Sequence, residues 1–312
     1  MILRSILIAL AALGAPAAAI AAEPAACRTV RLSDVGWTDI TATTALTATV
    51  LKALGYQPNI TVLSLPVTFS ALSTDDLDVF LGLWMPTMTA DIKPYADSGA
   101  VAVLGANLTG AKYTLATNKA GADLGIRDFA GIAAHKKELD GKIYGIEPGN
   151  DGNRLLLDMV ARDKFGLGTF EIVESSEQGM LAQVARADAA GKPVVFLGWE
   201  PHPMNSRFQM TYLPGGDEVF GPNLGGAEVH TVTRAGYSAE CPNMGRLLSN
   251  LVFTLPMENE VMGAILNDGQ DPAKAAQAWL KAHPEAAAPW LAGVTTFDGQ
   301  DAGAALAGAL GD

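Results

Sequence analysis

Two short apolar segments, far apart in the chain, have almost the same sequence and constrain the fold more than any other feature. Val79–Pro86 reads Val-Phe-Leu-Gly-Leu-Trp-Met-Pro, and Val195–Pro201 reads Val-Phe-Leu-Gly-Trp-Glu-Pro. Apolar runs of this length that stop at a proline are typical of buried β-strands. Each predicts a strand with a tryptophan, Trp84 or Trp199, at its C-terminal end. Since ligands of open α/β sheets bind beyond these ends, the two indoles could face one another across a cleft and form an aromatic cage for a cation.

The rest of the chain alternates between predicted strands and helices, which indicates α/β layers with mostly parallel sheets. The repeated strand motif is consistent with two similar α/β lobes. The predicted strands are Thr29–Val35, Ile60–Leu65, Val79–Leu83, Val101–Leu104, Tyr113–Thr117, Lys142–Ile146, Phe170–Val173, Val194–Leu197 and Glu228–Thr233. The predicted helices are Asp39–Leu54, Asn153–Lys164, Glu177–Ala189, Met244–Thr254 and Pro272–Ala282.

The first 22 residues have the composition of a secretory signal peptide. Arg4 lies near the start, an apolar run covers 6–13, and small residues cover 19–22. The apolar run is shorter than the roughly 20 residues that a membrane span needs. We therefore expect an exported, soluble protein in the periplasm. A lipid-acceptor role for Cys27 is the alternative, but Glu23 and Pro24 interrupt the apolar run before it.

The charge balance argues against two classes of partner. The chain has 33 Asp and Glu against 21 Lys and Arg, a net charge of −12, and the basic residues form no cluster. Nucleic acids and anionic membranes both need a Lys/Arg patch that neutralises phosphate, so neither is an expected partner. The acidity permits a cationic ligand, but it also simply keeps an exported protein soluble.

Enzyme and metal signatures are absent from the sequence. It contains no Gly-x-Ser-x-Gly elbow, no phosphate-binding Gly-x-x-x-x-Gly-Lys loop and no Cys-x-x-Cys. The four histidines are scattered without metal-ligand spacing. The sequence thus predicts a protein that is not an enzyme and that holds no metal or cofactor.

The two cysteines, Cys27 and Cys241, form an even count in an exported chain, which favours a disulfide. A bond between them requires their Cα atoms to lie within about 6 Å. The start of the mature chain and its last quarter would then belong to one domain, with the middle of the chain as an insertion. Two unrelated free thiols are the alternative.

Polar and aromatic residues follow several of the predicted strands. Trp37 and Asp39 come directly after the first strand, Tyr113 follows a predicted loop at 105–110 where the chain would cross between lobes, and Asn150 lies in the loop 147–152. Each has a structural alternative as well: tryptophans are usually packing residues, Asp39 could be a helix N-cap, and Asn150 could be a turn residue. The shared position of three indoles at strand ends favours a binding site.

At these residues the sequence resembles the periplasmic substrate-binding proteins of ABC importers for quaternary ammonium osmoprotectants, and among them the choline-binding members. The resemblance covers the whole chain after residue 22. Its segments are Gly36–Asp39, Leu83–Pro86, Lys112–Tyr113, Pro148–Asn150 and Gly198–His202, with Ala278–Leu280 and Trp290–Val294 near the C-terminus.

The resemblance implies two lobes, each with a mostly parallel sheet flanked by helices, and crossing strands as the hinge. Lobe 1 would consist of 23–111 plus 225–312, closed by the Cys27–Cys241 disulfide, and lobe 2 of 112–224. It implies a monomer that delivers choline to a membrane permease and its ATPase. The aromatic cage for the trimethylammonium group would be Trp37, Trp84, Tyr113 and Trp199, and the choline hydroxyl would be held by Asp39 and Asn150.

Two rival functions remain open. A carrier for glycine betaine or proline betaine would use the same cage but needs a cationic or N–H-rich subsite for the ligand carboxylate, whereas the nearest cage residue, Asp39, is acidic. A periplasmic choline-ester enzyme would need a nucleophile and a base near the cage, and no such pair is visible. Acetylcholine is a further ligand that the sequence does not rank against choline.

Overall fold

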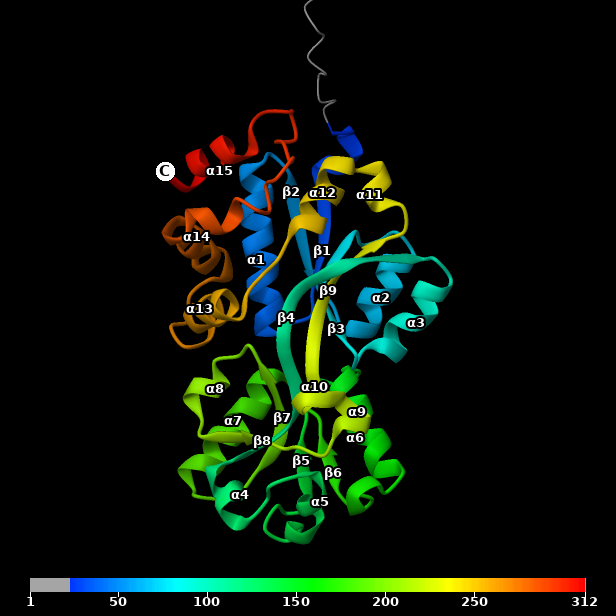
Figure 1. Ribbon diagram of the computed structural model, residues 1–312, viewed down its shortest axis with the longest axis vertical. Coiled ribbons are helices and arrows are strands. Elements are labelled where there is room, and N and C mark those ends of the chain that lie inside the picture. Colours follow the sequence, from blue (N-terminus) through cyan, green and yellow to red (C-terminus); the bar gives the residue numbers. More distant parts are fainter. Residues whose placement is uncertain (1–22, 312) are drawn as a thin grey trace, which may run out of the picture.

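A computed structural model of the chain describes residues 23–311, so the predicted signal peptide lies outside the described residues. These residues form a nine-stranded sheet that runs through two lobes (Figure 1). The strand order is β2-β1-β3-β9-β4-β7-β5-β6, and β8 pairs with β4. The strands are β1 Thr29–Asp34, β2 Gln57–Val62, β3 Val79–Met85, β4 Val101–Asn118, β5 Lys142–Tyr144, β6 Glu171–Val173, β7 Val195–Glu200, β8 Met210–Tyr212 and β9 Gly226–Arg234.

Helices cover the sheet in both lobes (Figure 1). In lobe 1 they are α1 Thr38–Ala53, α2 Leu65–Ser73, α3 Thr89–Asp97, α11 Tyr237–Glu240, α12 Pro242–Asn250, α13 Leu255–Leu266, α14 Pro272–Ala282 and α15 Ala302–Gly311. In lobe 2 they are α4 Lys119–Leu124, α5 Phe129–Ile132, α6 Asp151–Ala161, α7 Glu177–Ala189, α8 Met204–Arg207, α9 Asp217–Phe220 and α10 Pro222–Gly225. Short 3-10 helices are η1 Ala25–Arg28, η2 Ala133–His135, η3 Lys164–Gly166 and η4 Pro284–Ala287.

Strand β4 is a single strand of 18 residues that runs from lobe 1 into lobe 2 beside β9 (Figure 1). The predicted strands Val101–Leu104 and Tyr113–Thr117 are its two ends, so the predicted loop at 105–110 is wrong although the crossing is confirmed. The pairing with β9 continues through this segment because three register shifts, between Val103 and Ala111, absorb the extra residues.

Strand direction differs between the pairs. The β1–β2, β1–β3, β5–β6 and β5–β7 pairs are parallel, while the pairs that involve β4 or β9 are antiparallel. Each lobe therefore has the parallel α/β layers that the alternating pattern predicts. The antiparallel pairs belong to the strands that connect the lobes.

Several element boundaries differ from the sequence prediction, and two of these differences have a visible cause. The predicted strand Ile60–Leu65 is β2, shifted toward the N-terminus because it pairs in register with β1 from Gln57 onward. The predicted helix Met244–Thr254 ends at Asn250, and a separate helix, α13, begins after Thr254. Thr254 is the N-cap of α13, because its hydroxyl accepts the N–H of Met257.

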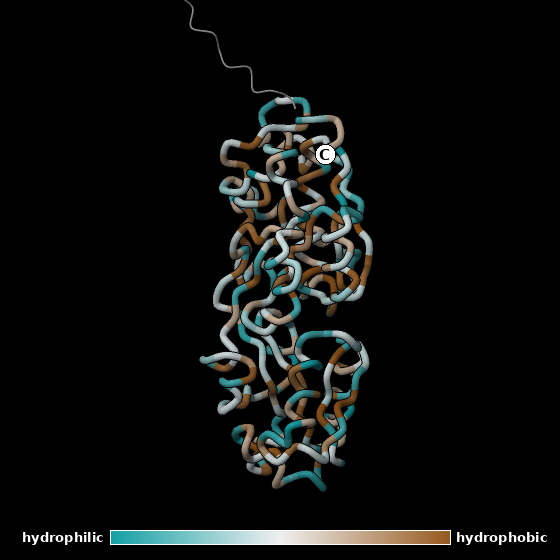
Figure 2. The backbone as a smooth tube through the Cα atoms, turned by 90° about the vertical axis from the view of Figure 1, so that its right-hand side faces the viewer, coloured by the Kyte–Doolittle hydropathy of each residue, from teal (hydrophilic) through white to brown (hydrophobic). Residues whose placement is uncertain are grey.

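The disulfide between Cys27 and Cys241 is present, with the Cα atoms 5.7 Å apart, which confirms this pairing. It joins η1 to the start of α12, so the start of the described chain and its last quarter lie side by side. The side view in Figure 2 shows an elongated body in which apolar segments occur throughout both lobes. Across 23–311, no helix combines the length and the apolar character that crossing a membrane requires.

Candidate functional site

A small cavity lies where the two lobes meet. Its lining contains every residue that the sequence singled out for ligand binding, and two that it did not. The lining residues are Trp37, Asp39, Trp84, Tyr113, Ile146, Asn150, Asp151 and Trp199. All eight are buried.

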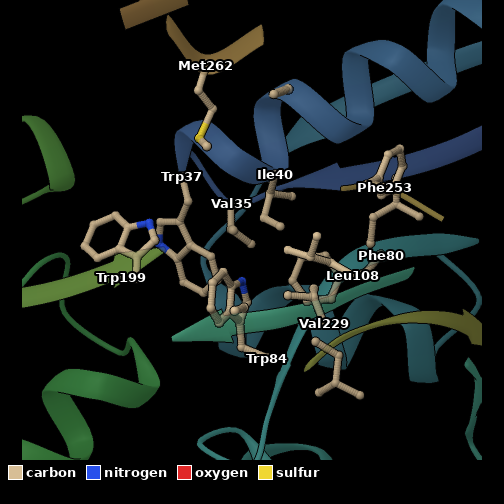
Figure 3. Close-up of a cluster of buried hydrophobic side chains, with 14 of the residues drawn as sticks. Val35, Trp37, Ile40, Phe80, Trp84, Leu108, Trp199, Val229, Phe253 and Met262 are labelled. Atoms are coloured by element: carbon tan, nitrogen blue, oxygen red, sulfur yellow. The ribbon is translucent and has the colours of Figure 1, made fainter. Parts of the chain in front are cut away.

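The three indoles reach this cavity from three different elements and point toward a common region (Figure 3). Trp37 precedes α1, Trp84 is in β3 and Trp199 is in β7. Between the two strand-borne indoles lies Tyr113, whose ring centroid is 5.9 Å from that of Trp84 and 6.2 Å from that of Trp199. The rings form a wall around the cavity, which is the cage arrangement that the two strand ends predict.

The glycine shared by the two Val-Phe-Leu-Gly segments permits this close arrangement. A Cβ on Gly82 would lie 2.7 Å from the Cδ1 of Ile40, so a larger residue would push this buried side chain of α1 away from β3. In β7, a Cβ on Gly198 would lie 3.0 Å from the Cβ of Ala116 in β4. The prolines that end the two segments both follow cis peptide bonds. Gly82 thus lies against Ile40 in the first turn of α1, where the neighbouring Asp39 contacts Trp84.

Asp39 is in the first turn of α1, and its carboxylate belongs to the cavity wall. Its Oδ2 accepts the Trp84 indole N–H at 3.1 Å, while Oδ1 is buried without a partner among residues 23–311. The N-cap position belongs to Trp37, so the interpretation of Asp39 as a cap is wrong. The pKa of Asp39 is raised to about 7, mainly by burial and then by the negative charge of Glu177.

Asn150 lies in the cavity wall and is also the N-cap of α6. Its Oδ1 caps α6 by accepting the N–H of Asn153, and the same oxygen accepts the Tyr113 hydroxyl, each at 3.1 Å. Its Nδ2 donates to Asp151 Oδ1 at 3.1 Å. The amide group is thus held rigidly at the cavity wall.

Asp151 is a lining residue that the sequence analysis missed. It is fully buried, and its Oδ2 has no hydrogen-bond partner within the described chain. Burial raises the pKa of Asp151 to about 6. The available signal was its position directly after Asn150 at the start of a helix, which placed a second carboxylate at the same strand end.

Further carboxylates surround the cavity. Glu147 accepts the Trp37 indole N–H at 2.7 Å, and burial raises its pKa to about 7. Glu258 in α13 is buried, and its pKa is raised well above the ordinary value, mainly by burial and then by the nearby charge of Asp39. A cavity with aromatic walls and unpaired carboxylate oxygens suits a small cation with an apolar surface. Its lining residues include no serine, cysteine, lysine or histidine that would form a nucleophile and base.

Residues 28–282 match the family described as the substrate-binding domain of the ABC-type glycine betaine transport system. The chain belongs to this family.

Two solved structures and one sequence relative illustrate the likeness of this substrate-binding protein to known members. An ABC-transporter choline binding protein in complex with choline is 66% identical, with a TM-score of 0.91 over 92% of this chain and 100% of that one. The unliganded semi-closed form has the same identity and coverage and a TM-score of 0.85. The glycine betaine/carnitine transport binding protein GbuC of Listeria monocytogenes is 32% identical over 132 residues, 42% of this chain and 43% of that protein. The score is higher with the choline complex than with the unliganded form, and buried hydrogen bonds between Thr38 and Glu177 join the two lobes across the cleft.

We expect acidification to close the ligand-free substrate-binding protein. In the closed structure burial raises the pKa of Asp39 and Glu147 to about 7 and that of Asp151 to about 6. In an open cleft these groups face water, where carboxyl pKa values are about 4. Between about pH 4 and 7 the closed form therefore binds more protons than the open form. The free energy that favours closure is thus present at low pH and is lost as the pH rises through 7.

X-ray scattering of the ligand-free protein at pH 5 and pH 8 measures this effect. The expected result is a smaller radius of gyration at pH 5. The doubly substituted Asp39→Asn, Asp151→Asn protein should respond less to pH. A radius of gyration that stays constant or increases on acidification would contradict the expected direction of the proton linkage.

Proposed function

We propose that this protein captures choline in the cavity between its lobes and delivers it to the membrane permease of an ABC importer. The observation that carries the proposal is a cavity with four aromatic side chains and an unpaired, buried Asp39 oxygen. The whole-length likeness to a choline-binding protein supports it.

The chemistry of choline fits the lining. A quaternary ammonium has no N–H donor, so attraction to ring faces within about 6 Å is the interaction available to it. Trp37, Trp84, Tyr113 and Trp199 supply these faces. The choline hydroxyl donates to the free Oδ1 of Asp39 and accepts from the Asn150 amide. Asp151 adds a second negative charge to the wall around the cation.

The expected affinity is micromolar or tighter. Each ring contributes about 0.5 to 2 kcal/mol, depending on its desolvation. A hydrogen bond from the hydroxyl to a carboxylate adds about 1.5 to 3 kcal/mol. After the entropy cost of association, the sum is compatible with the roughly 8 kcal/mol of micromolar binding.

Glycine betaine or proline betaine is the second candidate ligand, and the description of the family favours it. The cage would accept the betaine head equally well. The betaine carboxylate, however, would approach Asp39 and Asp151, and the lining contains no lysine or arginine to pair with it. Choline therefore fits better, while acetylcholine, which lacks the hydroxyl donor, leaves Asp39 unpaired.

The remaining parts of the proposal concern the setting. The protein acts as a monomer in the periplasm, after removal of residues 1–22, together with a permease and its ATPase. Lobe 1 comprises 23–111 plus 225–312, lobe 2 comprises 112–224, and they close over the ligand by bending of β4 and β9. The family supports the transport role, and a binding protein of this kind needs no catalytic group.

Replacement of Trp199 by Ala tests the cage. Choline binding should weaken by at least about 1 kcal/mol, roughly fivefold, and Trp199→Phe should retain part of the affinity because a phenyl face attracts a cation less strongly. Calorimetry with choline, acetylcholine, glycine betaine and proline betaine measures both the wild type and the variants.

Trp279→Ala is the matched control, because Trp279 lies in α14, where its indole N–H donates to Glu260 and its ring stacks on His283, away from the cavity. Its affinity for choline should equal that of the wild type. A folded Trp199→Ala protein with unchanged choline affinity would refute the cage.

A further inference from the structure

Helix α1 receives its N-terminal cap from the opposite lobe. Thr38 is the first residue of α1, and the preceding Trp37 makes no capping hydrogen bond within the described chain. Instead, Glu177 from α7 in lobe 2 accepts the Thr38 N–H with Oε2 at 2.9 Å and the Thr38 hydroxyl with Oε1 at 2.5 Å. A carboxylate at a helix start satisfies an otherwise unpaired N–H and interacts favourably with the helix dipole.

His202 in lobe 2 completes this contact. Its Nδ1 accepts the N–H of Met204 at 2.9 Å, which places the ring proton on Nε2. Nε2 lies 3.2 Å from Glu177 Oε1 and therefore donates to it. His202 is buried and packs against Trp199, with ring centroids 4.8 Å apart.

The Glu177 contact is more deeply buried than the other hydrogen bonds between the lobes, which join Trp37 to Glu147 and Arg154 to Asp91 and the Thr87 carbonyl. Arg154 of lobe 2 pairs with Asp91 of lobe 1, but the side chains are 39% and 21% exposed, and such pairs contribute little. Glu177 is 1% exposed and Thr38 3% exposed, so their hydrogen bonds form out of water. Opening of the cleft separates α1 from α7 and returns both groups to solvent.

We propose that Glu177 is a positioning residue whose carboxylate, held by His202, latches the closed cleft by capping α1 across the lobe boundary. The contact lies directly behind the cage, because Thr38 connects Trp37 to Asp39 and His202 supports Trp199. Formation of the latch thus coincides with assembly of the cage walls from both lobes. The contact exists only when the lobes meet, so the latch slows reopening and leaves ligand entry unaffected.

The latch extends the proposed function, and stopped-flow kinetics with choline test it. Glu177→Gln removes the charge at nearly constant shape, and Glu177→Ala removes the cap. The choline dissociation rate should rise about tenfold or more in both, as expected for loss of charge-assisted hydrogen bonds, while the association rate stays within about twofold. Thr38→Val, which keeps the backbone N–H, should cause a smaller rise and be non-additive with Glu177→Gln.

Two further measurements separate a latch from a merely structural residue. The melting temperature of the ligand-free Glu177→Gln protein should match that of the wild type, because the open form lacks the contact. Energy transfer between dyes on the two lobes should show fewer closed molecules in ligand-free Glu177→Gln than in ligand-free wild type. The control is Glu171→Gln, which removes an exposed lobe 2 carboxylate that pairs only loosely with Lys142, at 3.9 Å.

The outcomes are distinguishable from a failure of the proposed function. If the wild type binds glycine betaine and not choline, the choline proposal fails, and the same dissociation experiment with glycine betaine still measures the latch. If it binds neither ligand, the fraction of closed molecules in the ligand-free protein, measured by energy transfer, alone tests the latch. A dissociation rate within twofold of wild type in Glu177→Ala, or an unchanged closed fraction in Glu177→Gln, would overturn the latch.

Discussion

Replacing Asp39 by Asn is expected to weaken choline binding by about tenfold or more and to reduce its preference over glycine betaine. In the proposed complex the ionised Oδ1 accepts the choline hydroxyl, a charge-assisted hydrogen bond of about 1.5 to 3 kcal/mol. The same carboxylate faces the betaine carboxylate, and two like charges about 4 Å apart repel by roughly 4 kcal/mol at an effective dielectric constant of 20. The neutral amide of the variant would weaken the attraction and remove the repulsion.

The preference should also depend on pH. Burial raises the pKa of Asp39 to about 7, so a bound betaine can be accommodated by protonating this carboxyl group, and that limits the repulsion. Choline, in contrast, stabilises the ionised form. The wild-type ratio of choline to betaine affinity should therefore be larger at pH 8 than at pH 6, whereas the Asp39→Asn ratio should vary less with pH.

Calorimetry at the two pH values measures both ratios. Asp158→Asn is a suitable control, because Asp158 is an exposed residue of lobe 2 that pairs with Arg162 and lies outside the cavity lining. Thermal stability should barely change in Asp39→Asn, since Asp39 is not the N-cap of α1. Identical choline-to-betaine ratios in the variant and the wild type would remove the physical basis for choline selectivity at this residue.

Loss of the Cys27–Cys241 bond should destabilise the protein by about 2 to 5 kcal/mol, which would be the largest stability effect of the changes considered. The two cysteines are 214 residues apart, and in the chain-entropy description a closed loop of this length restricts the unfolded chain by about 5 kcal/mol. Both residues lie in lobe 1, on η1 and at the start of α12, at the end remote from lobe 2 (Figure 1). Choline affinity at 25 °C should therefore be nearly unchanged.

Scanning calorimetry of the double Cys27→Ser, Cys241→Ser protein, and of the wild type with reductant, measures the stability change. The melting temperature should fall in both cases, and the oxidised wild type should show no reactive thiol until it is unfolded and reduced. Two titratable thiols in the oxidised native protein, or an unchanged melting temperature after reduction, would contradict the role of the bond.

The local sequence was sufficient to predict the strand ends and six of the residues that line the cavity. The two Val-Phe-Leu-Gly segments are apolar because both faces of β3 and β7 are buried, and the residues that follow lie at the cavity. The position of Trp37 and Asp39 after the first strand followed from the same strand-to-helix pattern. These features depend on short-range periodicity and on one general property of α/β sheets, so the fold class and six cavity residues could be read from the sequence.

Other features depend on partners that are distant in the sequence. Residues 105–110 read as a loop from their Gly and Asn content, but pairing with β9, more than a hundred residues later, makes them part of β4. Glu177 read as the start of a helix, and its contact with Thr38, 139 positions earlier, arises only when the lobes close. The only sequence signal for Asp151 was its position directly after Asn150, and its unpaired oxygen becomes visible only once the surrounding cavity is known.

The placement of β9 between β3 and β4 also bears on the order in which the chain folds as it emerges from its N-terminal end. Lobe 2 consists of one continuous stretch between β4 and β9, so all of its contacts are available as soon as that stretch has emerged. Lobe 1 begins earlier, yet β3 has no neighbour on one side until β9 arrives, and Cys27 has no partner until Cys241 follows. Because long-range pairing comes late and is slow, we expect lobe 1 to be the first to emerge and the last to complete its structure.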